Sequence, residues 1–509
     1  MVKYTSQKQV KLEFFKHPFN NDLDPNNRWV KLSKLIPWDE LANVYSQKLD
    51  SNRGRFSVDV RTVLAAMIVK HFLKLDDRGT IQMIQENLYL QFFCGLPEFT
   101  HKPVFDPSLF VDIRKRLGGS EFDEFNKLVI SKFEAVKSQA INKKKSSKKK
   151  KSSSDDHHKD SDSENQTQNK GTLIADATVA DQEIKFPNDV DLLNQAREHL
   201  ERMVDTLYQQ DIDKQKPRLY RRVARADFLN FSKKKRKSKK FIRQHIKKQL
   251  QYVRRDLKVL RQMLANTQRQ KQLKSSDIQL LETINKLYEQ QKEMYEQKTH
   301  SIANRIINLY QPWVRPIVRG KSGKKVEFGS KINIMLKDGF VRVNHFDFEA
   351  FNEGQFVESM IENYYAFYGY YPEYFLGDKI YLNRANRKYL NEKNIKIVGK
   401  PLGRPPKQNN ETASEKRKKR KKAAERNQVE GKFGQAKRGY KLNNIKARLA
   451  ATSESWVNAI LFVLNLKKLA EQMEKYDGIF LSLFEKLYNR IKNWFKFEIN
   501  RKSIEILPV

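Results

Sequence analysis

One glutamate in a basic segment is the first candidate for chemistry. Glu430 lies in the stretch RNQVEGKFGQAKRGY (426–440), with Arg426 four residues before it and Lys437 seven residues after it. At about 100° per residue, these three side chains would point the same way from a helix. An ordinary ion-paired helix face explains the same pattern. A single glutamate also cannot hold a divalent metal ion, which prefers two or three oxygen ligands from separate elements.

Two aspartates upstream could supply the missing oxygen ligands. Asp176 lies inside the apolar run TLIADATV (172–179), and Asp378 lies near the C-terminal end of YFLGDKIY (374–381). Both runs predict short β-strands. An aspartate within an apolar strand is costly unless it has a partner or a function. The sequence therefore offers three carboxylates, two on strands and one on a helix.

The composition indicates a polyanionic partner. The 509 residues are enough for two to four domains, and they include 100 Lys and Arg against 60 Asp and Glu, a net charge of +40. Such a surplus fits nucleic acid, whose condensed counterions are released on binding, with a membrane surface as the alternative. No apolar run approaches the length of a membrane span, and the first residues lack a signal-peptide core. The single cysteine, Cys94, excludes an internal disulfide and a Cys-cluster zinc site. We therefore expect a cytoplasmic protein.

The N-terminal part is predicted to be helical. Apolar spacing predicts helices over 58–73, 79–93, 106–117 and 122–136. Short helices with tight connections in a basic chain suggest that residues 1–140 form a helix-turn-helix-like DNA-binding domain, and a generic helical bundle fits equally well. Residues 141–170 are rich in Lys, Ser, Asp and Gln, with almost no apolar residue, and are predicted to be a disordered linker.

The rest of the chain alternates strands and helices around a long helical stretch. Residues 171–192 and 311–450 are predicted to form an α/β core, 193–310 a helical insertion, and 451–509 closing C-terminal helices. Within the core we expect a hairpin over 327–346 that turns at Lys337-Asp338-Gly339, helices over 352–367 and 386–393, a strand over 395–398, and a basic helix from Thr412 to Gly439. The run KKKRKSKK (233–240) is predicted to be a loop, either solvated or in contact with phosphates.

With the insertion removed, this order of elements resembles the ribonuclease-H-like fold. In that fold an acid lies on the first strand, another at the end of the fourth strand, and a third on a later helix, as Asp176, Asp378 and Glu430 do here. Three carboxylates brought together in this way would bind two divalent ions, one activating water or a 3′-hydroxyl and one stabilising the leaving oxygen of a phosphodiester.

Several segments in the same order extend this likeness to a family. TLIADATVADQEIKFPNDVDLLNQARE, RPIVRGK, VEFGSKINI, FNEGQ, YPEYFLGDKIYLNRANRKYL, GKPLGRPPK and RNQVEGKFGQAKRGYKLNNI resemble the insertion-sequence DDE transposases of the IS-five superfamily. The resemblance implies that Asp176, Asp378 and Glu430 are a catalytic triad that binds two Mg²⁺ ions, for which Mn²⁺ can substitute. It also implies cut-and-paste transposition between terminal inverted repeats, with double-stranded DNA of element ends and target as partner. The resemblance further implies that the protein acts as a homo-oligomer on DNA, in the bacterial cytoplasm and associated with the nucleoid.

The resemblance also implies DNA contacts and has one departure. Relatives carry a Tyr, Arg, Glu, Lys pattern around the catalytic glutamate; Arg426, Glu430 and Lys437 fit, whereas Ala423 stands at the tyrosine position. Arg426 and Lys437 are thus expected to contact terminal phosphates. Further DNA-facing candidates, for which solvated charge or a plain loop is the alternative, are Arg315, Arg319, Lys321 and Arg404. A catalytically silent DNA-binding protein and a ribonuclease-H-like nuclease are the rival functions.

Overall fold

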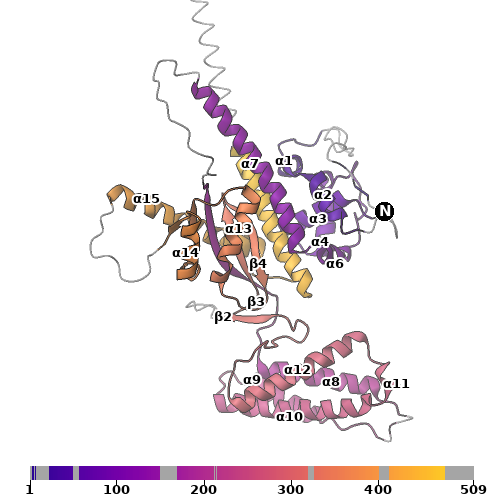
Figure 1. The fold of residues 1–509 in the computed structure, drawn as a ribbon. Helices are drawn as coiled ribbons and strands as arrows, with labels where there is room; N and C mark the ends of the chain where they lie inside the picture. Colours follow the sequence, from indigo (N-terminus) through magenta and orange to yellow (C-terminus); the bar gives the residue numbers. More distant parts are fainter. Residues whose placement is uncertain are drawn as a thin grey trace, which may run out of the picture.

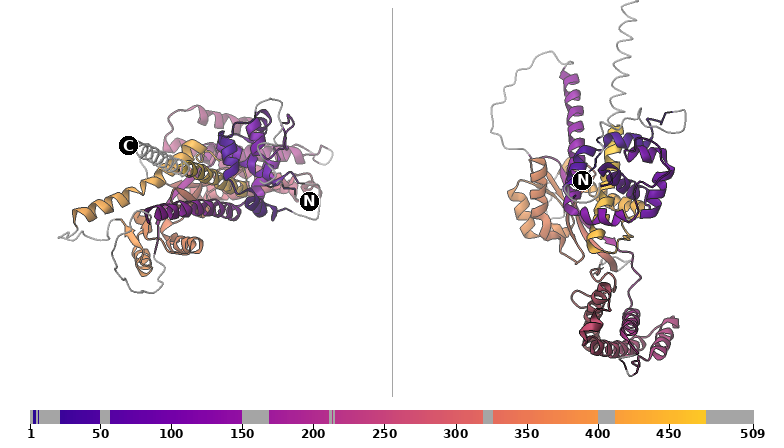
Figure 2. Two further views of the ribbon diagram at one scale, coloured as in Figure 1. Left: turned by 90° about the horizontal axis from the view of Figure 1, so that it is seen from above. Right: turned by 90° about the vertical axis from the view of Figure 1, so that its right-hand side faces the viewer.

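The computed structural model describes most of the chain (Figures 1 and 2). The described residues are 3–4, 6, 22–49, 57–149, 169–210, 213, 215–318, 326–399 and 412–475. Arg319, Lys321, Arg404 and most of the predicted linker therefore lie outside them, as does a closing helix expected over 479–494. No helix within the described ranges is both long and apolar enough to cross a membrane.

A mixed six-stranded sheet forms the centre of the molecule. Its strands are β1 (Thr172–Asp181), β2 (Arg315–Val318), β3 (Val326–Lys337), β4 (Phe340–Asp347), β5 (Tyr374–Leu376) and β6 (Lys396–Val398). The order is β2-β3-β1-β5-β6, and β4 pairs with the C-terminal part of β3. β1 is antiparallel to β3 and parallel to β5, which is parallel to β6. The predicted hairpin is confirmed as β3–β4, with Asp338 and Gly339 at positive φ, as a tight two-residue turn requires.

One face of the sheet is covered by helices that follow the hairpin. These are α13 (Val357–Tyr368), which continues the short η3 (Glu353–Phe356), and α14 (Arg384–Glu392). Their buried side chains, among them Met360 and Leu390, form a core with Leu173 and Phe375 from the strands. The strand expected over 374–381 ends at Leu376, and the turn η4 (Lys379–Tyr381) follows it.

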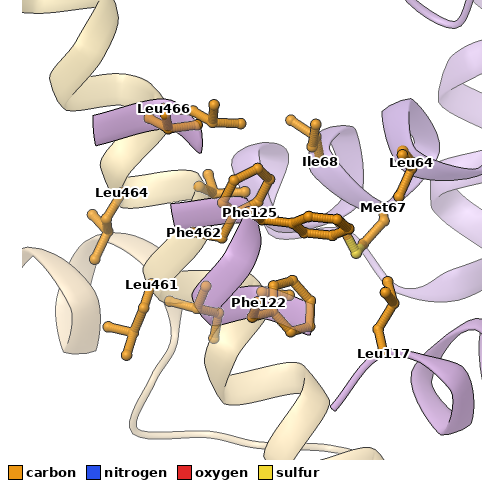
Figure 3. Close-up of a cluster of buried hydrophobic side chains, with 14 of the residues drawn as sticks. Leu64, Met67, Ile68, Leu117, Phe122, Phe125, Leu461, Phe462, Leu464 and Leu466 are labelled. Carbon is orange, nitrogen blue, oxygen red and sulfur yellow. The ribbon is translucent and has the colours of Figure 1, made fainter. Parts of the chain in front are cut away.

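The opposite face carries the N-terminal helices and the helix 450–475. The N-terminal helices are α1 (Arg28–Leu35), α2 (Trp38–Ser46), α3 (Val60–Leu73), α4 (Asp77–Glu86), α5 (Leu88–Phe93), α6 (Leu109–Arg116) and α7 (Gly119–Lys149). Their apolar core is continuous with that of the sheet face, because Phe462 of helix 450–475 packs between Phe122 and Phe125 (Figure 3). The buried amide of Asn465 bonds the backbone N–H and C=O of Val341 at 2.8 and 2.7 Å, which satisfies polar groups of β4.

Three sequence-based boundaries are wrong for local reasons. The helix expected over 79–93 is two helices, because Asn87 ends α4 and its side chain caps α5. α7 runs to Lys149 and covers the start of the predicted linker, since lysine is a good helix former even where nothing apolar is available. The apolar spacing of the third helix of the insertion continues to Leu309, but the helix ends at Gln297, where Lys298 adopts a positive φ.

Five helices lie between β1 and β2 and have a core of their own (Figure 1). They are α8 (Asp189–Leu207), α9 (Arg221–Lys233), α10 (Lys239–Leu264), α11 (Thr267–Gln270) and α12 (Ser275–Gln297). α8 and α10 pack along most of their length. The run KKKRKSKK was expected to form a loop, and the loop between α9 and α10 lies within it.

A buried carboxyl in this bundle should make stability depend on pH. Asp256 is fully buried, and neither carboxylate oxygen has a hydrogen-bond partner among the described residues. Burial first, and Glu201 next, raise its pKa to about 7 against the attraction of neighbouring arginines. The folded state therefore holds a proton that the unfolded state releases near pH 4, so stability falls as pH rises from about 4 to about 7.

We expect Asp256→Asn to gain stability relative to the wild type as pH rises, by up to about 4 kcal/mol between pH 4 and pH 8. Urea unfolding across that range measures it. The control is Asp227→Asn, because Lys248 and Tyr252 outweigh burial and lower the pKa of Asp227. Its stability difference from the wild type should be flat between pH 5 and pH 8. An equally flat difference for Asp256→Asn would contradict the prediction.

Candidate active site

The parallel pairing of β1 with β5 brings the two predicted aspartates together. Ile174 on β1 is paired with Leu376, the last residue of β5, and Asp176 and Asp378 each lie two residues further along the chain. Neighbouring strands are about 4.8 Å apart. Asp176 is still within β1 and largely buried, whereas Asp378 follows the end of β5 and its side chain is 51% exposed.

Arg426 joins these two carboxylates. One terminal nitrogen of its guanidinium (Nη2) lies 2.6 Å from Oδ1 of Asp378 and 4.0 Å from Oδ2 of Asp176. Arg426 stands in the turn between α15 (Ala413–Ala424) and α16 (Asn427–Gly434). Its Nε is buried and has no hydrogen-bond partner in the described part of the chain. An arginine at this point can neutralise either carboxylate and still donate elsewhere.

The Asp176 carboxyl is held in an environment that favours its protonated form. Burial is the largest cause, and the neighbouring carboxylates Asp378 and Glu353 add to it. A hydrogen bond from the Ala177 N–H and the charge of Arg426 act against these effects. The net result raises the pKa of Asp176 to about 6. Buried neighbouring carboxylates with perturbed pKa values are typical of functional sites, where a further cation would relieve the repulsion.

Glu430 lies on a helix next to the strand of Asp176, but it is not part of the ion-paired group of Asp176, Asp378 and Arg426. It lies on α16, which packs against β1 and buries Val429 in the core. Glu430 is exposed on that helix and makes no ion pair with another described residue. Among the described residues, no group of three or more His, Cys, Asp or Glu side chains is arranged to hold a metal. The triad of Asp176, Asp378 and Glu430 thus stays a prediction.

The single charged stripe expected on one basic helix is wrong. The helix breaks before Asn427, and η5 (Gln435–Gly439) is a π-helix, so the spacing of 3.6 residues per turn is not kept. Lys437 contacts Oε1 of Glu327 on β3 at 3.3 Å, whereas Arg426 contacts Asp378. Neither basic residue pairs with Glu430. π-helical turns are frequent at functional sites.

Arg315, the described member of the other DNA-facing candidates, is engaged within the fold. On β2 its Nε contacts Oε1 of Glu349 at 2.7 Å, and its Nη1 donates to the carbonyl of Pro312. These contacts hold the side chain against the residues that precede β2 and those that follow β4. The structure does not bring Arg315 to the aspartate pair.

Sequence reasoning missed Glu353 as a neighbour of the site. Its carboxylate contacts Nζ of Lys331 at 2.8 Å, and it acts on the pKa of both Asp176 and Tyr381. Tyr381 is buried, and its hydroxyl bonds Oδ1 of Asn333 at 3.1 Å. Glu353 lies in the segment FNEGQ, which was part of the resemblance, but no spacing rule links it to Asp176.

Two family models match the chain. Residues 375–467 match the family described as Transposase DDE domain, and residues 17–116 match the family described as Transposase domain (DUF772). Both matched families are transposase domains, so the two matches support an insertion-sequence DDE transposase. The matched DDE segment contains Asp378, Arg426, Glu430 and Lys437, and Asp176 lies before it. The matches do not name the IS-five superfamily, which stays a prediction.

A curated relative and a search of solved structures complete the comparison. The chain is 29% identical over 120 residues to "Uncharacterized protein ORF8 in nfe locus" of Rhizobium meliloti. The aligned part is 23% of this chain and 56% of that protein, so the chain spans about half the length of this relative. No solved structure matches. A DDE transposase domain implies a ribonuclease-H-like core, with which the mixed sheet is consistent, and DDE transposases generally use divalent metal ions.

Proposed function

We propose that this transposase cleaves DNA at the ends of a mobile element and joins the freed 3′-hydroxyl to target DNA. The observation that carries the proposal is the contact of Arg426 with both Asp176 and Asp378, at the end of β5 where it pairs with β1, and the helix that bears Glu430 packs against β1. A net charge of +40 supports double-stranded DNA as the partner. The core is proposed to be ribonuclease-H-like, interrupted by a helical insertion at 193–310.

The chemistry of the donor set fits divalent cations. Asp176 and Asp378 supply carboxylate oxygens, the ligands that Mg²⁺ prefers, and the pKa of Asp176 is raised by burial and then by neighbouring carboxylates, effects that a bound cation would oppose. Asp176 and Asp378 would hold Mg²⁺ or Mn²⁺, and Glu430 would complete the set. When bound, such ions lower the pKa of water and stabilise the charge on the phosphodiester oxygens.

The chain's own residues would position the DNA. Arg426 neutralises Asp378, and its side chain is 31% exposed, so the exposed part of its planar guanidinium would hold a phosphate while it stays next to the carboxylates. Lys437 contacts Glu327 on β3. It would place a second cation beside that strand. We propose that both contact the terminal phosphates.

The remaining parts have proposed roles as well. Residues 1–140 would bind the element ends, 141–170 would be a basic linker, 171–192 with 311–450 would be the catalytic core, and 451–509 would close it. The transposase would act as a homo-oligomer on paired ends in the bacterial cytoplasm.

A strand-transfer assay tests the function directly. Pre-cleaved duplexes that carry the element's terminal inverted repeats are incubated with supercoiled plasmid, the transposase and Mg²⁺. We expect joined products that grow with time and are absent in EDTA. Hydrolysis without joined products would favour the ribonuclease-H-like nuclease. DNA binding with neither product would favour the catalytically silent protein.

A further inference from the structure

The charge on helix α10 is almost entirely positive. The helix carries one acidic residue, the buried Asp256, and nine basic residues: Lys239, Lys240, Arg243, Lys247, Lys248, Arg254, Arg255, Lys258 and Arg261. Because Asp256 is buried, the exposed surface of α10 has no carboxylate. A helix of this length would normally mix both signs on its solvent face.

Five of these basic residues form one exposed row. Lys240, Lys247, Arg254, Lys258 and Arg261 are all exposed, and their spacing keeps them within about 60° around the helix axis. From the first to the last the row covers about 31 Å at 1.5 Å per residue. None of the five makes an ion pair with a described residue. We call these five residues the α10 basic row.

Three of the other four basic residues of α10 make contacts within the bundle, and the fourth, Lys239, is exposed at the start of the helix. Lys248 contacts Asp227 at 2.7 Å, Arg255 lies 3.7 Å from Asp256, and the Arg243 guanidinium lies 3.9 Å from the Tyr295 ring. The helix therefore separates most of its cations into an internal set held by acidic or aromatic side chains and an exposed row without acidic partners, in which Arg261 donates to the Asn285 amide oxygen at 2.8 Å.

The neighbouring helix α12 shows that an exposed surface with positive charge only is not a property of the whole bundle. Its exposed surface alternates signs, with Glu282, Glu289, Glu293 and Glu296 beside Lys286 and Lys292. Ordinary solvated helix faces look like α12. The α10 basic row is the departure, so it calls for a partner of opposite charge.

The row is continuous with two further basic features. At its start is the loop between α9 and α10, where Lys234, Lys235 and Arg236 are exposed. At its end, Arg261 lines a cavity of about 860 Å³ that also includes Lys286, Trp313 and Arg315. Trp313 and Arg315 lead into β2, so the basic surface ends beside the catalytic sheet.

The residues between the cations distinguish the possible partners. Gln244 and Gln251 lie in the row and are exposed, with no large apolar side chain alongside. A membrane-binding helix inserts Trp, Phe or Leu from the face opposite its cations, whereas the apolar face of α10 is buried in the core of the bundle. Lysine, arginine and glutamine in one straight line suit the regularly spaced phosphates of duplex DNA, for which a row of about 31 Å matches about nine base pairs.

We propose that the α10 basic row binds the phosphate backbone of duplex DNA and leads it toward the catalytic sheet. The inference rests on the proposed function, because the DNA would be that of the element ends or the target. Its recognition would be independent of base sequence, since the row offers charge and amide groups to phosphates only.

The test compares two triple variants of the full chain. Lys247→Glu/Arg254→Glu/Lys258→Glu changes the row, and Lys271→Glu/Lys274→Glu/Lys292→Glu makes the same change of charge at exposed lysines elsewhere in the bundle. Binding of a fluorescent 30-base-pair duplex of arbitrary sequence is measured by anisotropy in EDTA between 50 and 300 mM salt. We expect the row variant to bind at least about tenfold more weakly, with a salt slope lower by about 3. The control variant should stay within about threefold of the wild type.

The outcomes separate this inference from the proposed function. Equal weakening by both variants, or wild-type binding by the row variant, would overturn the inference while leaving the strand-transfer result untouched. Loss of binding to phosphatidylserine vesicles with unchanged DNA binding would overturn it in favour of a membrane. A wild-type chain that binds no duplex would overturn both. Should the row variant unfold, Lys247→Gln/Arg254→Gln/Lys258→Gln replaces it, with the same direction of change expected.

Discussion

Asp378→Asn is expected to reduce DNA strand cleavage by at least about a thousandfold, about 4 kcal/mol of transition-state stabilisation, while DNA binding is kept. The substitution keeps the shape of the side chain and removes one carboxylate oxygen from the pair with Asp176. Its cost to folding should be small, because the Asp378 side chain is 51% exposed and its ion pair with Arg426 is largely solvated. Cleavage of a plasmid that carries the element ends, measured in Mg²⁺ and in Mn²⁺, gives the rate.

Glu373→Gln is the matched control for that variant. Glu373 lies immediately before β5, contacts Lys396 at 3.1 Å and is remote in register from the aspartate pair. Both substitutions remove one negative charge next to β5, at opposite ends of the strand, so a general effect of charge on DNA binding would be shared. Cleavage by Asp378→Asn within tenfold of the wild-type rate would refute its role as a metal ligand.

The sequence predicted short strands around Asp176 and Asp378, because local patterns are sufficient to indicate a strand. Asp176 interrupts an apolar run that can only be a buried strand, and the Asp338-Gly339 turn places β3 against β4. The order of strands then puts Asp176 and Asp378 next to each other. Period-2 alternation and turn residues are the strongest local signals in a chain, and this part of the fold depends on little else.

The surroundings of the aspartates could not be predicted in the same way. The contact between Arg426 and Asp378 depends on a break before α16 that the helical periodicity conceals. The effect of Glu353 on Asp176 depends on how η3 follows the sheet edge. The π-helix that turns Lys437 toward Glu327 has no signature in the spacing. Each is a consequence of tertiary packing, which overrides local propensity.

The relation between the N-terminal helices and the sheet was also hidden from the sequence. Residues 1–140 and 451–509 each look like separate helical pieces, since amphipathic periodicity shows that a face is buried but not against what. In the structure, helix 450–475 packs against both the N-terminal helices and the sheet. Ion pairs of α7 with the hairpin, Glu134 with Lys337 and Asp123 with Arg342, extend the same contact.

Phe462→Ala is therefore expected to destabilise the N-terminal helices and the sheet together, by about 3–5 kcal/mol. Phe462 is fully buried, and its ring lies 5.5 Å from that of Phe125 and 6.1 Å from that of Phe122 (Figure 3). Removing it leaves a cavity where helix 450–475 packs against α7. Urea unfolding measures the loss, and hydrogen exchange resolved by peptide shows where protection falls.

The distribution of that loss decides whether the chain has one cooperative core or two. Because Phe462 and the sheet residue Val341 share a cluster, and Asn465 bonds Val341 directly, we expect exchange to rise in α3, α7 and β4 alike. Leu449→Ala, at a side chain that is half-exposed before the same helix, should change stability by less than about 0.5 kcal/mol. Faster exchange confined to the N-terminal helices would mean that the sheet is stable without them. Uniform loss would mean that a domain that binds DNA ends could transmit strain to the aspartate pair through helix 450–475, since the two share a close-packed interior.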